Sequence, residues 1–226
     1  MHPILSGKRV LLTQADCFMG PALQRVFEAA GAAVIADDRP LLDPALPEAL
    51  VRQAGDIDIL LAHLAVPSPR TPATDVADDE WREVFAHLVD PLPRLARAVL
   101  SGMVARGSGR ILVLGSASAL RGMRNASTYS AARGAQLAWV QALGVEVARS
   151  GVRVNAIAQN FVENPTYFPA EVQANPAFQE RLAREVPLGR LVSADEDARF
   201  AAYLCSDDAD CFVGQVFPVC GGWAVR

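Results

Sequence analysis

Short apolar runs alternate with helical segments along this chain, and this alternation restricts the fold more than any other feature. Apolar runs of strand length occupy residues 8–13, 33–36, 57–62, 111–114, 152–158 and 215–219. Helices are expected at residues 21–30, 127–150 and 194–206, and in a long stretch from residue 78 that Pro91 and Pro93 must kink or interrupt. Repeated strand–helix units predict an α/β fold with a doubly wound parallel sheet, which binds ligands at the carboxyl ends of its strands.

The length of the chain suits one globular unit. A chain of 226 residues can bury a full hydrophobic core, and no repeat, linker or low-complexity tract divides it. We therefore predict a single domain over residues 1–226. The segment from Asp37 to Ile57 is too short for both a further helix and a further strand, so the sheet is expected to be shortened between its second and third strands.

Composition limits the classes of function. The formal net charge is −4, so the chain lacks the basic footprint of a nucleic-acid-binding protein. No apolar run is long enough to span a membrane, and the first residues lack the pattern of a signal peptide. The four cysteines form no CxxC motif, and the three histidines have no carboxylate or cysteine cluster nearby. We therefore expect a cytoplasmic protein with no membrane partner and no metal site.

A tyrosine and an arginine stand four residues apart in the expected helix 127–150. Positions i and i+4 share one helix face, so Tyr129 and Arg133 lie side by side. Arginine keeps its proton and acts as a fixed positive charge, which stabilises the phenolate form of the tyrosine. A Tyr-x-x-x-Arg pair alone more often marks an interfacial tyrosine and a solvated arginine. Ser116, at the end of an apolar strand, favours the catalytic interpretation instead. It completes a candidate catalytic set in which Tyr129 is the general base.

The C-terminal part of the chain carries a family signature. Residues 201–207 read Ala-Ala-Tyr-Leu-Cys-Ser-Asp, and Val-Gly-Gln at 213–215 and Gly-Gly at 221–222 follow. Together with the strand–helix layout, these residues resemble the short-chain dehydrogenase/reductase superfamily over nearly the whole chain. The resemblance implies a Rossmann-like catalytic domain. In that superfamily, a serine, a tyrosine and a lysine four residues later transfer hydride with a nicotinamide cofactor.

The loop after the first strand departs from the superfamily pattern. Glycines there let backbone amides approach a pyrophosphate, but this chain has Gln14 and Phe18 in two of the positions and keeps only Gly20. Phe18 is expected to direct its ring into the space of a dinucleotide, and Asp16 adds negative charge where phosphates would lie. Asp37, after the second strand, is interpreted as a turn residue rather than a ribose ligand.

Three further departures agree with the first. His63 replaces an asparagine motif at the end of the third strand and is interpreted as a wall residue. Arg133 replaces the lysine, which keeps the charge and changes the hydrogen-bond geometry. Gln159, Asn160 and Phe161 replace the Pro-Gly turn that borders the nicotinamide in the superfamily.

These coordinated changes resemble the halohydrin (haloalcohol) dehalogenases, a family within the superfamily. The resemblance implies a cofactor-independent lyase that displaces halide from vicinal haloalcohols to give epoxides. It also implies the reverse opening of epoxides by halide, azide, cyanide or nitrite. In this chemistry Tyr129 removes the hydroxyl proton, Arg133 stabilises the phenolate, and Ser116 holds the substrate oxygen.

The same resemblance indicates binding residues and an assembly. The residues expected to bind halide or substrate are Phe18, Gln159, Asn160, Phe161, Tyr167 and Phe168. Backbone amides and the side-chain amide of Asn160 are expected to hold the halide, and Tyr167 and Phe168 to form walls. A homotetramer is also implied, built as a dimer of dimers by packing of the apolar helix 127–150.

Two alternatives remain open. An NAD(P)-dependent short-chain reductase with a degraded cofactor loop would use the same Ser116 and Tyr129, with Arg133 in place of lysine. A non-catalytic sensor or scaffold is the other alternative, although such a protein has no need of a charge beside its tyrosine.

Overall fold

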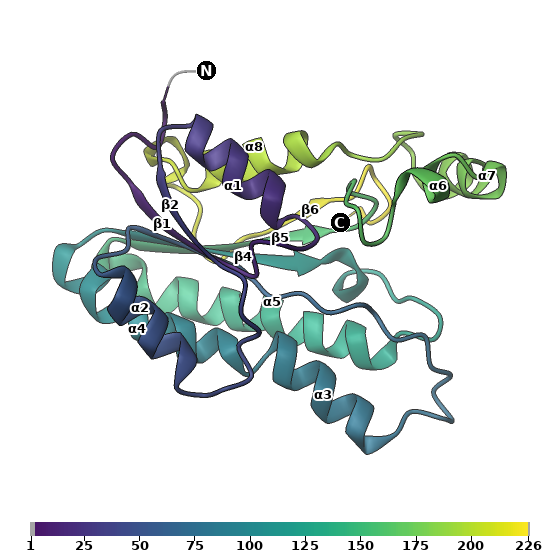
Figure 1. Ribbon diagram of the computed structural model, residues 1–226, viewed down its shortest axis with the longest axis horizontal. Helices are drawn as coiled ribbons and strands as arrows, with labels where there is room; N and C mark the ends of the chain where they lie inside the picture. The colour runs from purple at the N-terminus through teal and green to yellow at the C-terminus, as the bar shows by residue number, and fades with distance from the viewer. Residues whose placement is uncertain (1–2, 226) are drawn as a thin grey trace.

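One six-stranded parallel sheet forms the centre of the protein (Figure 1). The computed structural model describes residues 3–225. The strands are β1 (Arg9–Thr13), β2 (Ala33–Asp37), β3 (Ile59–His63), β4 (Gly109–Ser116), β5 (Val152–Gln159) and β6 (Val216–Val219). They lie in the order β2-β1-β3-β4-β5-β6, and every neighbouring pair is parallel. The doubly wound α/β fold expected from the alternating apolar runs is confirmed.

Helices cover both faces of the sheet (Figure 1). One face carries α1 (Gly20–Ala29) and α8 (Ala194–Leu204), which pack against each other. The other face carries α2 (Leu46–Ala54), α3 (Asp78–Leu88), α4 (Pro91–Arg106) and α5 (Ser127–Val147). Strands β3 and β4 are buried along their whole length because both of their faces are covered. The apolar strand residues therefore divide between two cores, one under each helical layer.

The boundaries of the elements follow the signals in the sequence. Each strand begins and ends within two residues of its expected position. Pro91 starts α4 after a break that separates it from α3, as the prolines require. The helix expected to reach residue 150 ends at Val147 and continues as the 3₁₀ turn Ala148–Ser150. Between β2 and β3 only α2 is present, as the short segment indicated.

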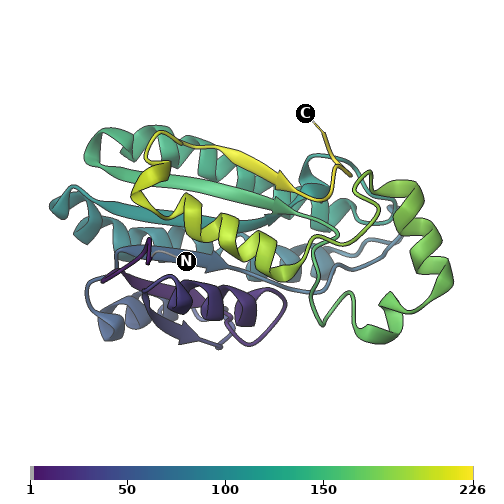
Figure 2. The ribbon, with the colours of Figure 1, turned by 90° about the horizontal axis from the view of Figure 1, so that it is seen from above.

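Two helices between β5 and β6 form a lobe that the sequence analysis did not anticipate. Figures 1 and 2 show α6 (Ala170–Gln173) and α7 (Pro176–Glu185) beyond the carboxyl ends of the strands. Asn175 caps α7 by accepting a hydrogen bond from the amide of Ala177. Only Leu182 is buried on α7, so no apolar period indicated the helix. The lobe stands at the edge of the sheet where such folds bind ligands.

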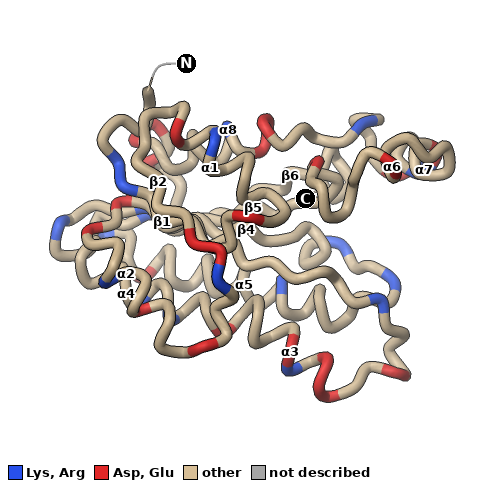
Figure 3. Tube along the Cα trace, in the orientation of Figure 1, with Lys and Arg blue, Asp and Glu red and all other residues tan. Residues whose placement is uncertain are grey.

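Charged residues are distributed over the described chain rather than gathered on one element. Figure 3 shows acidic and basic positions interspersed on both helical layers and on the lobe. Within residues 3–225, no helix is both long enough and apolar enough to cross a membrane.

A close backbone approach explains the one glycine that remains in the loop after β1. A Cβ atom at Gly20 would overlap the backbone carbonyl of Ala15. The Gly20 amide also donates a 2.8 Å hydrogen bond to the carbonyl of Cys17, which closes the turn. Gly134 on α5, by contrast, has open space where a Cβ atom would lie. The start of α1 therefore depends on glycine at position 20.

We expect Gly20→Ala to lower the free energy of unfolding by about 1–3 kcal/mol, because α1 must move away from the loop to admit the methyl group. Gly134→Ala is the matched control and should raise the free energy of unfolding by up to about 1 kcal/mol, because alanine is the better helix former. Urea unfolding measures both. If Gly20→Ala had the same free energy of unfolding as wild type, the close approach between Gly20 and the carbonyl of Ala15 would be contradicted.

Candidate active site

A cavity of about 220 Å³ opens at the carboxyl ends of the central strands. Its walls come from the loops after β1, β3, β4 and β5, from the start of α5 and from the α6–α7 lobe. All residues singled out from the sequence as catalytic or binding line this cavity: Phe18, Ser116, Tyr129, Arg133, Gln159, Asn160, Phe161, Tyr167 and Phe168. The fold thus brings together side chains that are far apart in the sequence.

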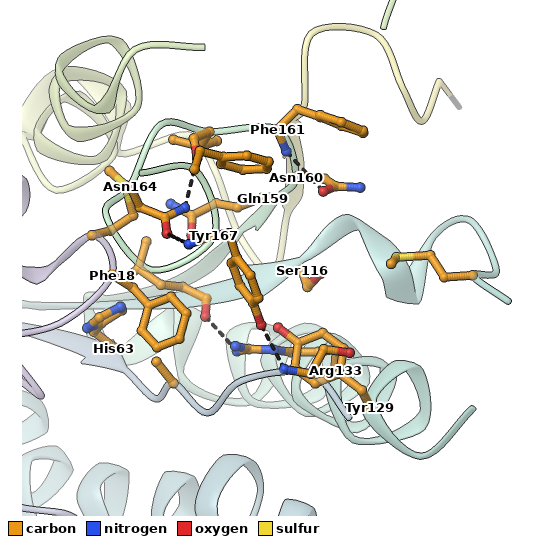
Figure 4. A pocket seen from close by; sticks show the side chains of 18 of the residues that line it. Phe18, His63, Ser116, Tyr129, Arg133, Gln159, Asn160, Phe161, Asn164 and Tyr167 are labelled. Atoms are coloured by element: carbon orange, nitrogen blue, oxygen red, sulfur yellow. Dashed lines mark hydrogen bonds between the residues drawn. The ribbon is translucent and has the colours of Figure 1, made fainter. Parts of the chain in front are cut away.

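Ser116, Tyr129 and Arg133 lie together at one wall of the cavity (Figure 4). Ser116 is the last residue of β4, and the other two residues occupy the first turns of α5. Their exposed fractions are 9%, 7% and 5%. The guanidinium carbon of Arg133 lies 5.1 Å from the centre of the Tyr129 ring. This is the side-by-side arrangement that the i, i+4 spacing predicts.

Arg133 carries a buried positive charge that forms no ion pair with any described residue. Its Nη1 donates to the carbonyl oxygen of Leu114 at 3.0 Å and to Oε1 of Gln136 at 2.9 Å, and its Nε has no hydrogen-bond partner there. Gln136 is fixed in turn by a hydrogen bond to the carbonyl of Leu88. Because an unpaired buried charge is unfavourable, this guanidinium favours an anion beside it, and the Tyr129 ring is its neighbour in the cavity wall.

A backbone amide orients the hydroxyl of Ser116. Its Oγ accepts a 3.2 Å hydrogen bond from the amide of Ser118, which caps the 3₁₀ turn Ala117–Ala119. Because this bond uses an oxygen lone pair, the hydroxyl proton of Ser116 remains available to another acceptor. An oxygen atom of a ligand in the cavity can therefore receive it.

The side chains of Gln14 and Phe18 occupy space that glycines would leave open. Both residues keep positive φ angles, 48° and 46°, a conformation natural for glycine and uncommon for residues with side chains. Oε1 of Gln14 accepts a hydrogen bond from the amide of Ala65 and so ties the loop after β1 to the loop after β3. The ring of Phe18 lies 5.3 Å from the ring of Tyr167. The loop therefore projects side chains, rather than bare backbone, toward the cavity.

Backbone amides of this loop are engaged within the protein. The amide of Ala15 donates to the carbonyl of Asp37 at 3.1 Å, and the amide of Gly20 donates to Cys17. The carboxylate of Asp37 accepts a hydrogen bond from the amide of Arg39 and pairs with its guanidinium. Asp37 therefore makes the turn contacts expected of it, and the amides of Ala15 and Gly20 are not available to a phosphate.

His63 is a neutral part of the cavity wall. Its exposed fraction is 3%, and its Nδ1 lies 2.9 Å from the carbonyl oxygen of Gln14. Because that oxygen only accepts, Nδ1 carries the proton. Burial, assisted by the positive charge of Arg133, lowers the pKa of His63 to about 4. The geometry thus agrees with its interpretation as a wall residue.

The loop after β5 offers two backbone donors to the cavity, the amides of Val162 and Asn164, because neither has an acceptor within the described chain. The amide of Phe161 donates to Oδ1 of Asn160 at 2.9 Å, so it is not available to a ligand. The amide of Val162 has no acceptor within the described chain, and Val162 lines the cavity. Asn164 holds the loop by donating to the carbonyl of Val162 and accepting from the amide of Tyr167. The backbone donors that remain for a ligand in this loop are therefore the amides of Val162 and Asn164.

Tyr167 joins two sides of the cavity. Its hydroxyl accepts a 2.8 Å hydrogen bond from the amide of Ser68, and Figure 4 shows its side chain directed toward Tyr129 and Arg133. Removal of the hydroxyl from water, together with the nearby Tyr129, raises the pKa of Tyr167 to about 12. Tyr167 therefore stays protonated and acts as a hydrogen-bonding wall residue.

Gln159 contacts a buried carboxyl group that the sequence analysis did not single out. Its Nε2 donates to Oδ2 of Asp197 on α8. Asp197 is fully buried, and its Oδ1 has no partner in the described chain. Burial, opposed by the hydrogen bond from Gln159, raises the pKa of Asp197 to about 7. The protein therefore fixes the side-chain amide of Gln159 through one of its two N–H donors, and the second donor stays available.

Several other lining residues escaped the sequence analysis: Ser68, Arg70, Met123, Asn164 and Arg181. They lie on loops and on α7, where no strand or helix period marked them. Gln136 did have a signal, because it stands three residues after Arg133 on the same helix face.

The sequence from residue 8 to residue 224 matches the family profile described as enoyl-(acyl carrier protein) reductase. The chain therefore belongs to this family of the short-chain dehydrogenase/reductase superfamily. One relative is a 2-keto-3-deoxy-L-fuconate dehydrogenase of Xanthomonas campestris pv. campestris. It is 30% identical, and the alignment covers 97% of this chain and 81% of the relative.

Solved structures with dehalogenase names are also similar. A protein described as a dehalogenation enzyme has a TM-score of 0.91 and 33% identity, over 98% of this chain and all of its own. A halohydrin dehalogenase bound to ethyl (2S)-oxiran-2-ylacetate has a TM-score of 0.85 and 27% identity, over 97% of this chain and 98% of its own. The comparisons thus relate this chain to dehydrogenases and to dehalogenases, and a shared fold does not decide between them.

We expect Asp197→Asn to stabilise the protein more at pH 8 than at pH 4.5. The unfolded carboxyl group ionises near its ordinary pKa of 3.8, whereas the folded one keeps its proton to about 7. Wild-type stability therefore falls as the pH rises between these values, by about 1.4 kcal/mol for each unit of the shift. Asparagine keeps an acceptor for Gln159 and cannot ionise.

Thermal unfolding of wild type and Asp197→Asn at the two pH values measures this difference. Asp208→Asn, at an exposed position, is the control and should change stability equally at both. If the difference in stability between Asp197→Asn and wild type were the same at pH 4.5 and pH 8, the claim that folded Asp197 keeps its proton would be wrong.

Proposed function

We propose that the chain is a cofactor-independent halohydrin dehalogenase, which converts vicinal haloalcohols into epoxides and halide. The observation that carries the proposal is the buried cation of Arg133 beside Tyr129, with Ser116 on the same wall of the cavity. The cavity volume suits a small substrate. The likeness to a dehalogenation enzyme and to a halohydrin dehalogenase supports the same activity.

The proposed reaction begins with loss of the substrate hydroxyl proton. Ser116, whose oxygen is held by the amide of Ser118, donates its proton to a hydrogen bond with the substrate oxygen. Tyr129, as phenolate stabilised by Arg133, takes the hydroxyl proton. The electron pair of the alkoxide then attacks the neighbouring carbon, the carbon–halogen bond breaks, and the halide leaves with that bond's electrons. The reaction therefore involves no hydride transfer.

The halide needs a partly desolvated site with hydrogen-bond donors. We assign this site to the amide of Val162, the side chain of Asn160 and the ring edges of Phe18 and Phe161. In the reverse direction, halide, azide, cyanide or nitrite in this site attacks an epoxide carbon. Tyr129 then returns its proton to the epoxide oxygen.

The loop after β1 carries side chains where a dinucleotide-binding loop carries glycines. Phe18 lines the cavity beside Tyr167, Gln14 bonds to the loop after β3, and the amides of Ala15 and Gly20 donate to protein carbonyls. These features support a reaction that proceeds without a nicotinamide cofactor.

A nicotinamide-dependent reductase is the second candidate function. The observation in its favour is the reductase profile together with the dehydrogenase relative. This function would use Ser116 and Tyr129 in the same places. It also requires the side chains of Gln14 and Phe18 to leave their present contacts so that a dinucleotide can approach β1.

We also propose a homotetramer, built as a dimer of dimers, in which α5 contributes to the contact between copies. The outward face of α5 exposes the apolar side chains of Ala138, Ala142 and Val145. Val145 is 72% exposed. Burial of such a face between helices of neighbouring copies would remove this apolar surface from water.

We expect the protein to release halide and form epoxide from small vicinal chloro- and bromo-alcohols in a buffer without nicotinamide. Tyr129→Phe removes the base and keeps the ring, so turnover should fall by about 10²–10⁴-fold. Tyr203→Phe is the matched control, because Tyr203 lies on α8 outside the cavity, and it should keep wild-type turnover. Ion chromatography and gas chromatography measure the two products.

Absence of halide and epoxide above the uncatalysed rate, across several haloalcohols, would contradict the proposal. Stoichiometric binding of NADPH in a calorimetric titration, with reduction of a ketone substrate, would favour the reductase instead. Circular dichroism of Tyr129→Phe establishes that any loss of turnover occurs in a folded protein.

We expect bromide to inhibit epoxide formation competitively, and more strongly than chloride, because it gives up its hydration more easily. Asn160→Asp should raise the inhibition constant of bromide by about tenfold or more, because the carboxylate repels the anion. The carboxylate can still accept the hydrogen bond from Phe161, so the loop should keep its shape. Unchanged bromide inhibition in Asn160→Asp would place the halide elsewhere.

A further inference from the structure

The cavity is lined by two exposed arginines in addition to the buried one. Arg70 lies on the loop between β3 and α3, and Arg181 lies on α7. Among residues 3–225, no aspartate or glutamate lines the cavity. With Arg133, the lining therefore contains three guanidinium groups and no carboxylate. Such a cavity attracts anions.

The main chain around Arg70 is held on both sides. The amide of Ser68 donates to the hydroxyl of Tyr167 at 2.8 Å, and the hydroxyl of Thr71 donates to a carboxylate on α3. Three prolines in segment 66–72 further restrict this loop. The guanidinium of Arg70 has no hydrogen bond or ion pair with any described residue. A stiff loop thus presents an unpaired positive charge to the cavity.

Arg181 is fixed against the wall of the cavity. Its guanidinium carbon lies 5.4 Å from the centre of the buried Phe161 ring. Its Nε pairs with Glu185 at 3.2 Å, and Glu185 also pairs with Arg184. Both Nη atoms of Arg181 have no partner within the described chain, so two parallel donors remain for an external anion.

We infer that the preferred substrates carry an anionic substituent, such as a carboxylate, which Arg70 and Arg181 bind while the reacting group reaches Ser116 and Tyr129. The inference rests on the proposed function of the site. Two guanidinium groups that line one cavity repel each other, and a carboxylate between them removes this repulsion. The planar donors of arginine match the two oxygens of a carboxylate.

Two substrates of nearly equal size test the inference: 4-chloro-3-hydroxybutanoate and its neutral amide, 4-chloro-3-hydroxybutanamide. Wild-type kcat/KM should be higher for the acid by about tenfold or more, mainly through a lower KM. Arg70→Gln and Arg181→Gln should each lower kcat/KM for the acid by about tenfold and leave that for the amide within about twofold. Arg184→Gln is the matched control, because Arg184 shares Glu185 but does not line the cavity.

Equal kcat/KM for the acid and the amide would overturn the inference and leave the proposed function standing. A second outcome would also overturn the inference. Arg70→Gln and Arg181→Gln would open a neutral epoxide with azide more slowly than wild type, while kcat/KM stayed equal for the acid and the amide. The arginines would then attract small nucleophiles rather than an anionic substituent of the substrate. If neither substrate reacts and the small neutral haloalcohols also give no halide or epoxide, the proposed function fails. The anion site is then tested by calorimetric binding of 3-hydroxybutanoate and 3-hydroxybutanamide. Tighter binding of the acid, lost in both Arg70→Gln and Arg181→Gln, supports the anion site. Equal binding of the two compounds overturns it.

Discussion

The buried guanidinium of Arg133 is the constraint on which the site depends. It is held by the carbonyl at Leu114 and by Gln136 rather than by a carboxylate, so its charge acts on whatever lies beside it. The neighbouring groups are consistent with this charge. His63 stays neutral because its pKa is lowered to about 4, and Tyr167 stays protonated because its pKa is raised to about 12. Among the neighbouring groups, Tyr129 lies directly against the guanidinium, with the centre of its ring 5.1 Å from the guanidinium carbon.

The loop after β1 combines a backbone path that suits glycine with residues that carry side chains. Gln14 and Phe18 follow a left-handed backbone path that suits glycine, and each such position costs about 1–3 kcal/mol. Contacts to Ala65 and Tyr167 offset part of this strain. The backbone of a phosphate-binding loop is thus retained while its space is filled by side chains. A local change of this kind leaves the sheet and the helices intact.

The sequence predicted the sheet well because buried parallel strands are continuous apolar runs. It predicted the pairing of Tyr129 and Arg133 because helical spacing alone sets it. It did not predict α7, whose polar sequence has no apolar period, and so it missed Arg181. It also missed the contact between Gln159 and Asp197, because a hydrogen bond between residues far apart in the chain depends on how α8 packs on the sheet.

In the proposed reaction, the same electrostatics must let the product halide leave. Nη1 of Arg133 donates to Leu114 and Gln136, and the donors assigned above to the halide are neutral amides, which bind an anion more weakly than a guanidinium. Asp197 stands one hydrogen bond behind this loop, through Gln159. As the pH rises through about 7, Asp197 loses its proton and places a negative charge behind the loop. Epoxide formation releases a proton and an anion, whereas epoxide opening consumes both, so higher pH favours the release of halide and lower pH favours the binding of the incoming anion.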